Sequence, residues 1–255
     1  MAKFRYRGQT AFLIVLLSIL VSACAGGKNV EEPQDPAYAR FKQGEEAFEN
    51  ENYVRAIEHW QAVRDMYHST ELTTLAERKI ADAQYAGGQT IEAIAGYENF
   101  LKQHPGHPQT REILVRLGKA HFSEMLSADR DQTATRNALA TFEEVQRNYP
   151  DPKDKEEIDA LIRKCKDRLA ENELYIARFY LKTERYEPAR ARLEHLRRSY
   201  PEFSRMPEAE FLLARAYYFT DAEDQSINLL RNLENSVQDE DLREEILDFR
   251  TEHNL

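Results

Sequence analysis

The sequence predicts an all-α fold of stacked helix pairs, and three observations support this prediction. From Tyr38 to the C-terminus, apolar residues recur at spacings of three and four, and no run alternates strictly between apolar and polar residues. Such spacing is typical of helices that bury one face, whereas strands alternate with a period of two. The other two observations are columns of matching small and large residues that recur along the chain.

The columns emerge when four segments are aligned: YVRAIEHWQAVRDMY, TIEAIAGYENFLKQHP, TRNALATFEEVQRNYP and YEPARARLEHLRRSYP. The small residues of the first column are Ala56, Ala93, Ala138 and Ala189, and four positions later come Trp60, Tyr97, Phe142 and Leu193. A proline ends the last three segments, at Pro105, Pro150 and Pro201. Small residues let paired helices approach closely, and proline stops the second helix. The pattern predicts a tetratricopeptide-repeat solenoid of about five helix-turn-helix repeats.

Residues 1–23 have the layout of an export signal. The basic start MAKFRYR is followed by AFLIVLLSILVSA, which contains no charged residue. This apolar run is shorter than the roughly 20 residues that a membrane-spanning helix needs. We therefore expect a lipoprotein signal peptide over residues 1–23 rather than a transmembrane anchor.

Cys24 follows this run directly, and the stretch LVSAC resembles the lipobox of bacterial lipoproteins, in which the cysteine is acylated and becomes the mature N-terminus. Cys24 is therefore expected to attach lipid and to hold the chain on a membrane. By the same resemblance, Ala25 in place of Asp favours the periplasmic face of the outer membrane. Residues 24–37 contain Gly, Pro and charge without an apolar period, which predicts a lipidated flexible tether.

The remaining chain divides at a long helical segment. Residues 38–152 are expected to form repeats 1–3, with the small residues Gly44, Ala81 and Gly118 in their first helices. Helical period then continues from Lys153 to about Leu181, too far for one ordinary repeat helix. We expect this helix to link the N-terminal group of three repeats to a C-terminal pair. Residues 153–255 would thus hold the linking helix, repeats 4 and 5, and a C-terminal helix.

Charge and residue content exclude several functions. The formal net charge is −10, and it becomes −13 without residues 1–23, which hold three cations and no anion. Nucleic acid requires a positive surface, so we expect no nucleic acid partner. His104 and His107 lie in a repeat junction without a third suitably spaced metal ligand. Phosphate loops, nucleophile elbows and zinc motifs are also absent from the sequence.

The second cysteine, Cys165, is expected to be a buried and inert thiol. It shares a helical stripe with Ile158, Ile162 and Leu169, whereas a reactive cysteine needs an exposed, electropositive site. Without a catalytic set, the sequence predicts a binding protein with no cofactor, no metal and no enzymatic activity.

Two sets of residues are candidates for binding. The fourth repeat contains a basic stretch, here called the Arg stretch, which consists of Arg190, Arg192, Arg197 and Arg198. The segment from Asp221 to Asp248 contains ten acidic residues. These opposite charges would either pair with each other inside the protein or orient a partner. The aromatic residues Tyr53, Trp60 and Tyr97 would either fill the repeat core or line a substrate groove, where such anchors are favoured.

Three segments resemble the BamD family, the lipoprotein of the β-barrel assembly machinery (BAM) of Gram-negative bacteria. They are HPGHP at 104–108, DRDQTATRNALATFEEVQRNYPD at 129–151 and RLAENELYIARFYLKTERYEPARARLEHLRRSYPE at 168–202. The resemblance implies a scaffold at the outer membrane. It also implies that the C-terminal repeats contact the barrel-forming BAM subunit and smaller BAM lipoproteins, and that the N-terminal repeats receive unfolded outer-membrane proteins.

Carried over to this sequence, the resemblance assigns partner binding to Arg190, Arg192, Arg197 and Arg198, and the substrate groove to Tyr53, Trp60 and Tyr97. A second interpretation stays open, because repeat folds recur in many envelope machines and fold alone does not determine function. The chain would then be another repeat lipoprotein, such as a factor for pilus secretin assembly or competence.

Overall fold

The computed structural model describes residues 35–66 and 70–255, and within them every regular element is a helix. The predicted export signal and Cys24 lie outside these residues. The described helices are α2 (Pro36–Glu49), α3 (Tyr53–Asp65), α4 (Thr70–Ala86), α5 (Thr90–Gln103), α6 (Thr110–Ser123), α7 (Thr133–Asn148), α8 (Lys155–Lys182), α9 (Tyr186–Ser199), α10 (Met206–Tyr218), α11 (Glu223–Ser236) and α12 (Glu240–His253).

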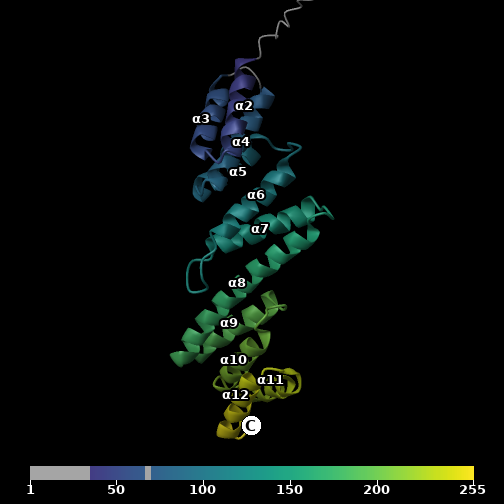
Figure 1. The fold of residues 1–255 in the computed structure, drawn as a ribbon. Helices are drawn as coiled ribbons and strands as arrows, with labels where there is room; N and C mark the ends of the chain where they lie inside the picture. Colours follow the sequence, from purple (N-terminus) through teal and green to yellow (C-terminus); the bar gives the residue numbers. More distant parts are fainter. Residues whose placement is uncertain (1–34, 67–69) are drawn as a thin grey trace, which may run out of the picture.

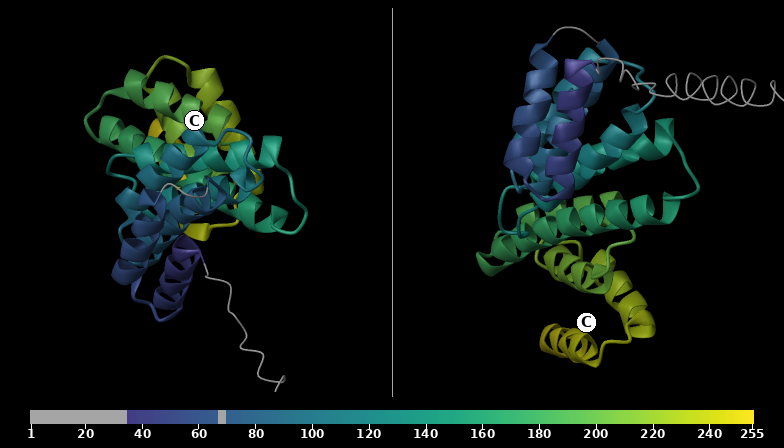
Figure 2. Two further views of the ribbon diagram at one scale, coloured as in Figure 1. Left: turned by 90° about the horizontal axis from the view of Figure 1, so that it is seen from above. Right: turned by 45° about the horizontal axis from the view of Figure 1, so that its top comes forward.

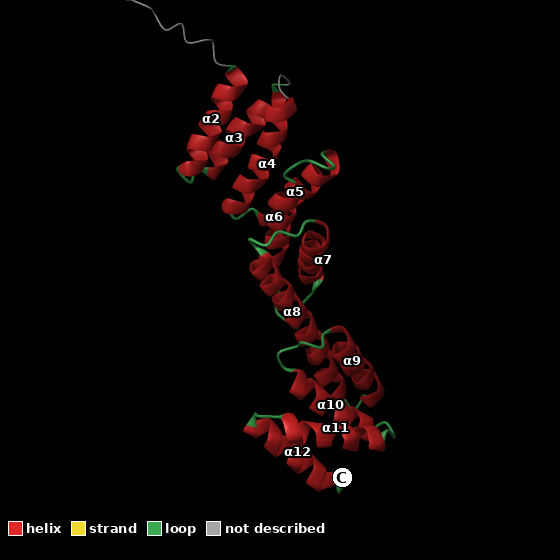
Figure 3. Ribbon diagram, turned by 90° about the vertical axis from the view of Figure 1, so that its right-hand side faces the viewer, coloured by secondary structure: helices red, strands yellow, loops and turns green. Residues whose placement is uncertain are grey.

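The helices stack in chain order, as the repeats require. Each helix packs mainly against the ones before and after it, and the pairs α2/α3, α4/α5, α6/α7, α8/α9 and α10/α11 form five repeats. Figure 1 shows the stack running from α2 at one end to α12 at the other, and Figure 3 shows that its regular elements are helical. The predicted all-α tetratricopeptide-repeat solenoid is confirmed.

The two aligned columns form the interior of the stack. All four alanines of the small column are fully buried, and the large residues four positions later are at most 1% exposed. First-helix glycines allow the close approach. A Cβ atom on Gly44 would lie 2.5 Å from Trp60 Nε1, and one on Gly118 would lie 2.6 Å from Phe142 Cε1. The aromatic rings therefore pack directly against the backbone of the partner helix.

Replacing Gly118 by Ala is expected to destabilise the protein by about 1 to 2 kcal/mol. Alanine would favour the helix by nearly 1 kcal/mol, but its methyl group would collide with the buried ring of Phe142. Urea unfolding of the wild type and of the Gly118→Ala variant measures the difference in their free energies of unfolding. The double variant Gly118→Ala with Phe142→Leu should recover part of the loss, because the smaller side chain makes room. A Gly118→Ala variant more stable than the wild type would contradict this packing.

The linking helix is α8, which is 28 residues long and packs against both α7 and α9. Its first half joins the core of the third repeat through Ile158 and Ile162, and its second half joins the C-terminal core through Leu174 and Ala177. One continuous helix therefore belongs to two cores, and Figure 2 shows it extending beneath the N-terminal repeats. The predicted helix from Lys153 to about Leu181 agrees closely with the observed bounds.

Cys165 lies in the first half of α8 and is fully buried, as predicted. Its Sγ atom is 3.9 Å from the sulfur of Met125. Burial, and then the nearby charge of Glu143, raise the pKa of Cys165 to about 12. The thiol is therefore protonated at neutral pH and lacks the reactive thiolate.

The last helix, α12, follows the fifth repeat and packs much less on its predecessor than the other helices do. Ile246 and Phe249 are its buried residues. Phe249 contributes to an aromatic cluster with Phe211 and Tyr218 of α10, at ring separations of 6.1 and 5.7 Å. A few aromatic contacts thus attach α12 to the end of the stack.

Candidate functional site

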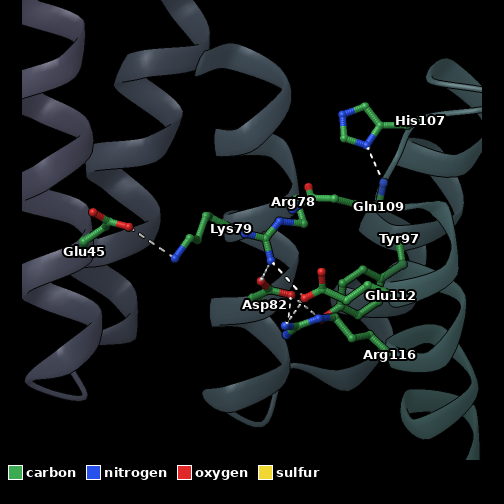
Figure 4. Close-up of polar contacts among 9 residues, drawn as sticks. All are labelled: Glu45, Arg78, Lys79, Asp82, Tyr97, His107, Gln109, Glu112 and Arg116. Carbon is green, nitrogen blue, oxygen red and sulfur yellow. Dashed lines mark hydrogen bonds and ion pairs between the residues drawn. The ribbon is translucent and has the colours of Figure 1, made fainter. Parts of the chain in front are cut away.

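The first helices of the N-terminal repeats share a polar cluster centred on Asp82 of α4 (Figure 4). Asp82 is only 8% exposed. Its carboxylate accepts hydrogen bonds from Tyr97 Oη of α5 at 2.9 Å, from Arg78 Nη1 at 3.0 Å and from Arg116 Nη1 of α6 at 3.0 Å. One buried carboxylate therefore joins three helices of two repeats.

Glu112 on α6 extends this cluster toward solvent. It receives a hydrogen bond from Arg116 Nη2 at 2.7 Å and lies 3.6 Å from Arg78 Nη1. The hydrogen bond from Arg116 lowers the pKa of Glu112. Burial, and then the charge of Asp82, raise the pKa of Tyr97 far above its ordinary value, so its hydroxyl remains a donor. Glu112 and Arg116 are both partly exposed, so the cluster presents both signs of charge at the surface.

Further ion pairs connect successive first helices along the stack. Glu45 of α2 lies 3.4 Å from Lys79 of α4, as Figure 4 shows. Lys119 of α6 lies 2.6 Å from Glu157 of α8, and Arg178 of α8 pairs with Glu208 of α10. Pairs of this partly exposed kind contribute little stability each. The first helices α2, α4, α6, α8 and α10 together form one surface of the stack, here called the first-helix face. The ion pairs give this face charges of both signs that alternate from one repeat to the next.

Two of the three predicted groove residues lie in the interior of the stack rather than on its surface. Trp60 and Tyr97 are both fully buried, so the prediction that they line an exposed groove is wrong. They belong to second helices, and their column faces the first helix of the same repeat. Trp60 Nε1 donates a hydrogen bond to the carbonyl of Phe41 on α2 at 3.2 Å. Tyr53 is half-buried against the ring of Phe48, 5.4 Å away, and its role in binding stays a prediction.

The Arg stretch divides into two parts. Arg190 donates to Thr220 Oγ1 at 3.1 Å and pairs with Glu187 at 2.8 Å. Arg192 pairs with Glu173 of α8 at 3.1 Å. Both arginines are therefore paired inside the protein. Arg190 contacts its own helix and the turn after α10, and Arg192 contacts α8, so neither pairs with a carboxylate of the acidic segment.

Arg197 and Arg198 form the other part. Both side chains are exposed at the end of α9, and neither forms an ion pair within the described residues. Of the four arginines in the Arg stretch, Arg197 and Arg198 are consequently the two whose side chains are available to pair with a partner protein.

The histidines of the HPGHP junction have structural contacts. His104 Nε2 lies 2.8 Å from a carboxylate oxygen of Glu77, and the rings of His104 and His107 pack on Phe100. Among the described residues, no group of three His, Cys, Asp or Glu side chains is arranged to hold a metal ion. The same part of the chain contains no helix with the length and apolar character needed to span a bilayer.

Stacked helix pairs with a charged first-helix face define a tetratricopeptide-repeat scaffold. The chain belongs to the YfiO family of outer membrane lipoproteins, whose family model matches residues 33–229. The match covers all five repeats except the end of α11, and it stops before α12.

Relatives with similar sequences are named as assembly factors. The outer membrane protein assembly factor BamD of Caulobacter vibrioides is 26% identical over 219 residues, which cover 84% of this chain and 71% of that protein. The BamD of Neisseria gonorrhoeae is 27% identical over 220 residues, covering 80% and 82%. Among solved structures, the TPR2AB domain of yeast Sti1 in complex with pHSP90 is 12% identical, with a TM-score of 0.42, and the alignment covers 78% of this chain and 76% of that one.

Proposed function

We propose that this chain is an outer-membrane lipoprotein scaffold of the β-barrel assembly machinery that binds partner subunits and unfolded outer-membrane proteins. The observation that carries the proposal is the family match over residues 33–229, together with relatives named BamD that align along most of both chains. In this proposal the lipid on Cys24 holds the scaffold on the periplasmic face of the outer membrane.

Unfolded outer-membrane proteins would bind to the first-helix face of repeats 1–3. An extended chain presents backbone donors and acceptors together with side chains of both charges. The partly exposed Glu112 and Arg116 offer an acceptor and a donor close together on this face, and the buried contacts to Asp82 hold Arg116 in place. A pre-organised polar face loses little conformational entropy when it binds a chain. This face replaces Trp60 and Tyr97 as the expected contact with substrate.

Partner subunits, namely the barrel-forming BAM subunit and the smaller BAM lipoproteins, would bind at the end of α9. Arg197 and Arg198 are two neighbouring exposed cations that form no close ion pair with the described residues, although the charge of Arg197 acts on Glu210 of α10. Such a pair would attract an acidic surface and orient it before contact. Arg190 and Arg192 would instead support this surface through their bonds to neighbouring helices.

Replacing both Arg197 and Arg198 by Glu is expected to reduce the amount of co-purified partner subunit by at least tenfold, since like charges facing each other cost several kcal/mol. The measurement is a pull-down of the lipidated protein from mild detergent, with quantitative mass spectrometry. Arg147→Glu is the matched control, because Arg147 is exposed and lies two residues before Tyr149, as Arg198 does before Tyr200. If the double variant has a normal unfolding midpoint and recovers as much partner subunit as the wild type, the assignment of partner binding to Arg197 and Arg198 is wrong.

A further inference from the structure

A cavity of about 530 Å³ separates α12 from the first helices of repeats 4 and 5. One wall is formed by α8 and α10 and includes the cations Lys182 and Arg215. The other wall is the start of α12 and includes Asp241 and Glu245. The volume falls within the range of roughly 300–1,000 Å³ that is typical of binding sites for small ligands. A few residues of an extended peptide would fit, whereas a folded domain would not.

Arg215 is the most unusual group in this cavity. Its Cζ atom lies 5.8 Å from the ring centroids of both Phe211 and Phe249, so two aromatic rings hold the guanidinium. Its Nε atom is buried and has no hydrogen-bond partner, and Arg215 forms no ion pair with any described residue. Aromatic contacts fix a guanidinium without neutralising its charge. Such a group is prepared to receive a carboxylate, because the two rings already hold the half-buried guanidinium in place and its Nε atom is already out of contact with water.

The charges that face Arg215 across the cavity remain separate from it. Arg178, on the same wall, already pairs with Glu208, and Asp239 uses its carboxylate to cap α12 through the backbone N–H of Leu242. Asp241 and Glu245 form no ion pair with the described residues, and neither does Lys182. Arg215 and Lys182 therefore face Asp241 and Glu245, and the charge of Glu245 also acts on Arg178. A complementary ligand needs a charge of each sign.

We propose that this cavity binds a short extended peptide segment of a partner protein, which places a carboxylate on Arg215 and a basic side chain against Asp241 and Glu245 of α12. The carboxylate would come either from an internal Asp or Glu or from the end of a chain. The site lies partly on α12, beyond the family match, and it uses none of the residues of the Arg stretch. The pull-down with the Arg197 and Arg198 variant can therefore fail while peptide binding at Arg215 is found, and the reverse can also occur, so the two proposals are tested separately.

A peptide array tests the proposal with the full lipidated chain in detergent micelles. Each immobilised octapeptide has one acidic and one basic residue in an alanine background, at all separations from one to four and in both orders. Matched copies replace the acid by its amide, and another set replaces the internal acid by a free C-terminal carboxylate. The chain is applied as wild type, as Arg215→Gln and as Arg231→Gln, the last being an exposed arginine of α11 outside the cavity.

We expect a subset of peptides to be retained at least tenfold better by the wild type and by Arg231→Gln than by Arg215→Gln. Loss of retention on changing the peptide acid to its amide identifies an internal carboxylate, and retention confined to the free-end set identifies a chain terminus. Glu245→Gln should weaken the dependence on the basic residue of the peptide. Unfolding midpoints of the variants control for folding. The proposal is overturned if no peptide requires both its own carboxylate and Arg215.

Discussion

Replacing Asp82 by Asn is expected to lower the free energy of unfolding by about 3–5 kcal/mol. The carboxylate of Asp82 is buried and receives hydrogen bonds from Tyr97, Arg78 and Arg116. Removing its charge would leave the guanidinium groups of Arg78 and Arg116 with only the partly exposed Glu112 as a counter-ion. Removing one partner of a buried ion pair is costly because the other charge stays buried. Urea unfolding followed by the fluorescence of Trp60 measures the loss, because Trp60 is the only tryptophan and lies in the adjacent repeat.

The matched control is Glu240→Gln, which removes a carboxylate from an exposed pair with Arg243. Exposed pairs contribute at most about 1 kcal/mol, so this variant should unfold almost like the wild type. A loss below about 1 kcal/mol for Asp82→Asn would mean that the cluster is solvated in solution and does not join the repeats. In that case the first-helix face would also lose its support as a pre-organised binding surface.

The second large effect is expected from Trp60→Ala, at about 3–5 kcal/mol of unfolding free energy. Trp60 is fully buried between the helices of the first repeat, and its indole N–H is bonded to the carbonyl of Phe41. Truncation would leave a cavity and would remove the hydrogen bond that joins α3 to the carbonyl of Phe41. Because the variant has no tryptophan, its unfolding is followed by circular dichroism instead.

Tyr85→Ala serves as the control for Trp60, since Tyr85 is an aromatic side chain of the neighbouring repeat that is 36% exposed. We expect that variant to lose less than about 1 kcal/mol. If Trp60→Ala kept its stability and weakened only the binding of unfolded chains, Trp60 would be a surface residue. The sequence-based groove assignment would then be right, and its placement in the core wrong.

The fold was largely predictable because its determinants are local or repeat at regular intervals. The small and large columns of the second helices occur in four segments, and each pair of positions packs in the same way. The long helix was predictable because its apolar stripe continues without interruption from one core to the next. Glycine and alanine in the first helices indicated where backbones approach, as Gly44 and Gly118 do.

The candidate binding face could not be predicted because it depends on contacts between repeats. Arg78 and Asp82, four residues apart on α4, look like an ordinary surface pair in the sequence. Only the stacking of α6 on α4 and α5 brings Arg116 to the same carboxylate and buries it. Likewise, the sequence gives no indication that Arg192 pairs with Glu173 of the preceding helix.

The turns within the repeats were predictable only in part. Between the two helices of repeats 1, 2, 4 and 5, one residue adopts a left-handed backbone, at Glu51, Gly88, Glu184 and Asp221. Only the glycine of repeat 2 signals this conformation strongly, because an L side chain adopts it at some cost. Among the other three, Asp221 gives a weak signal, because Asp is enriched in this conformation, whereas Glu51 and Glu184 give none. The turns at Glu51 and Glu184 follow from the packing of the helices around them.

Depletion of the protein in its own cells, followed by quantification of folded outer-membrane β-barrels, tests the proposed assembly function most directly. Heat-modifiable mobility of barrel proteins reports their folding, and mass spectrometry reports their precursors. A scaffold of the assembly machinery predicts that folded barrels decline together while their precursors are still made. Normal barrels, with loss only of pili or DNA uptake, would contradict the account and indicate a different envelope machine.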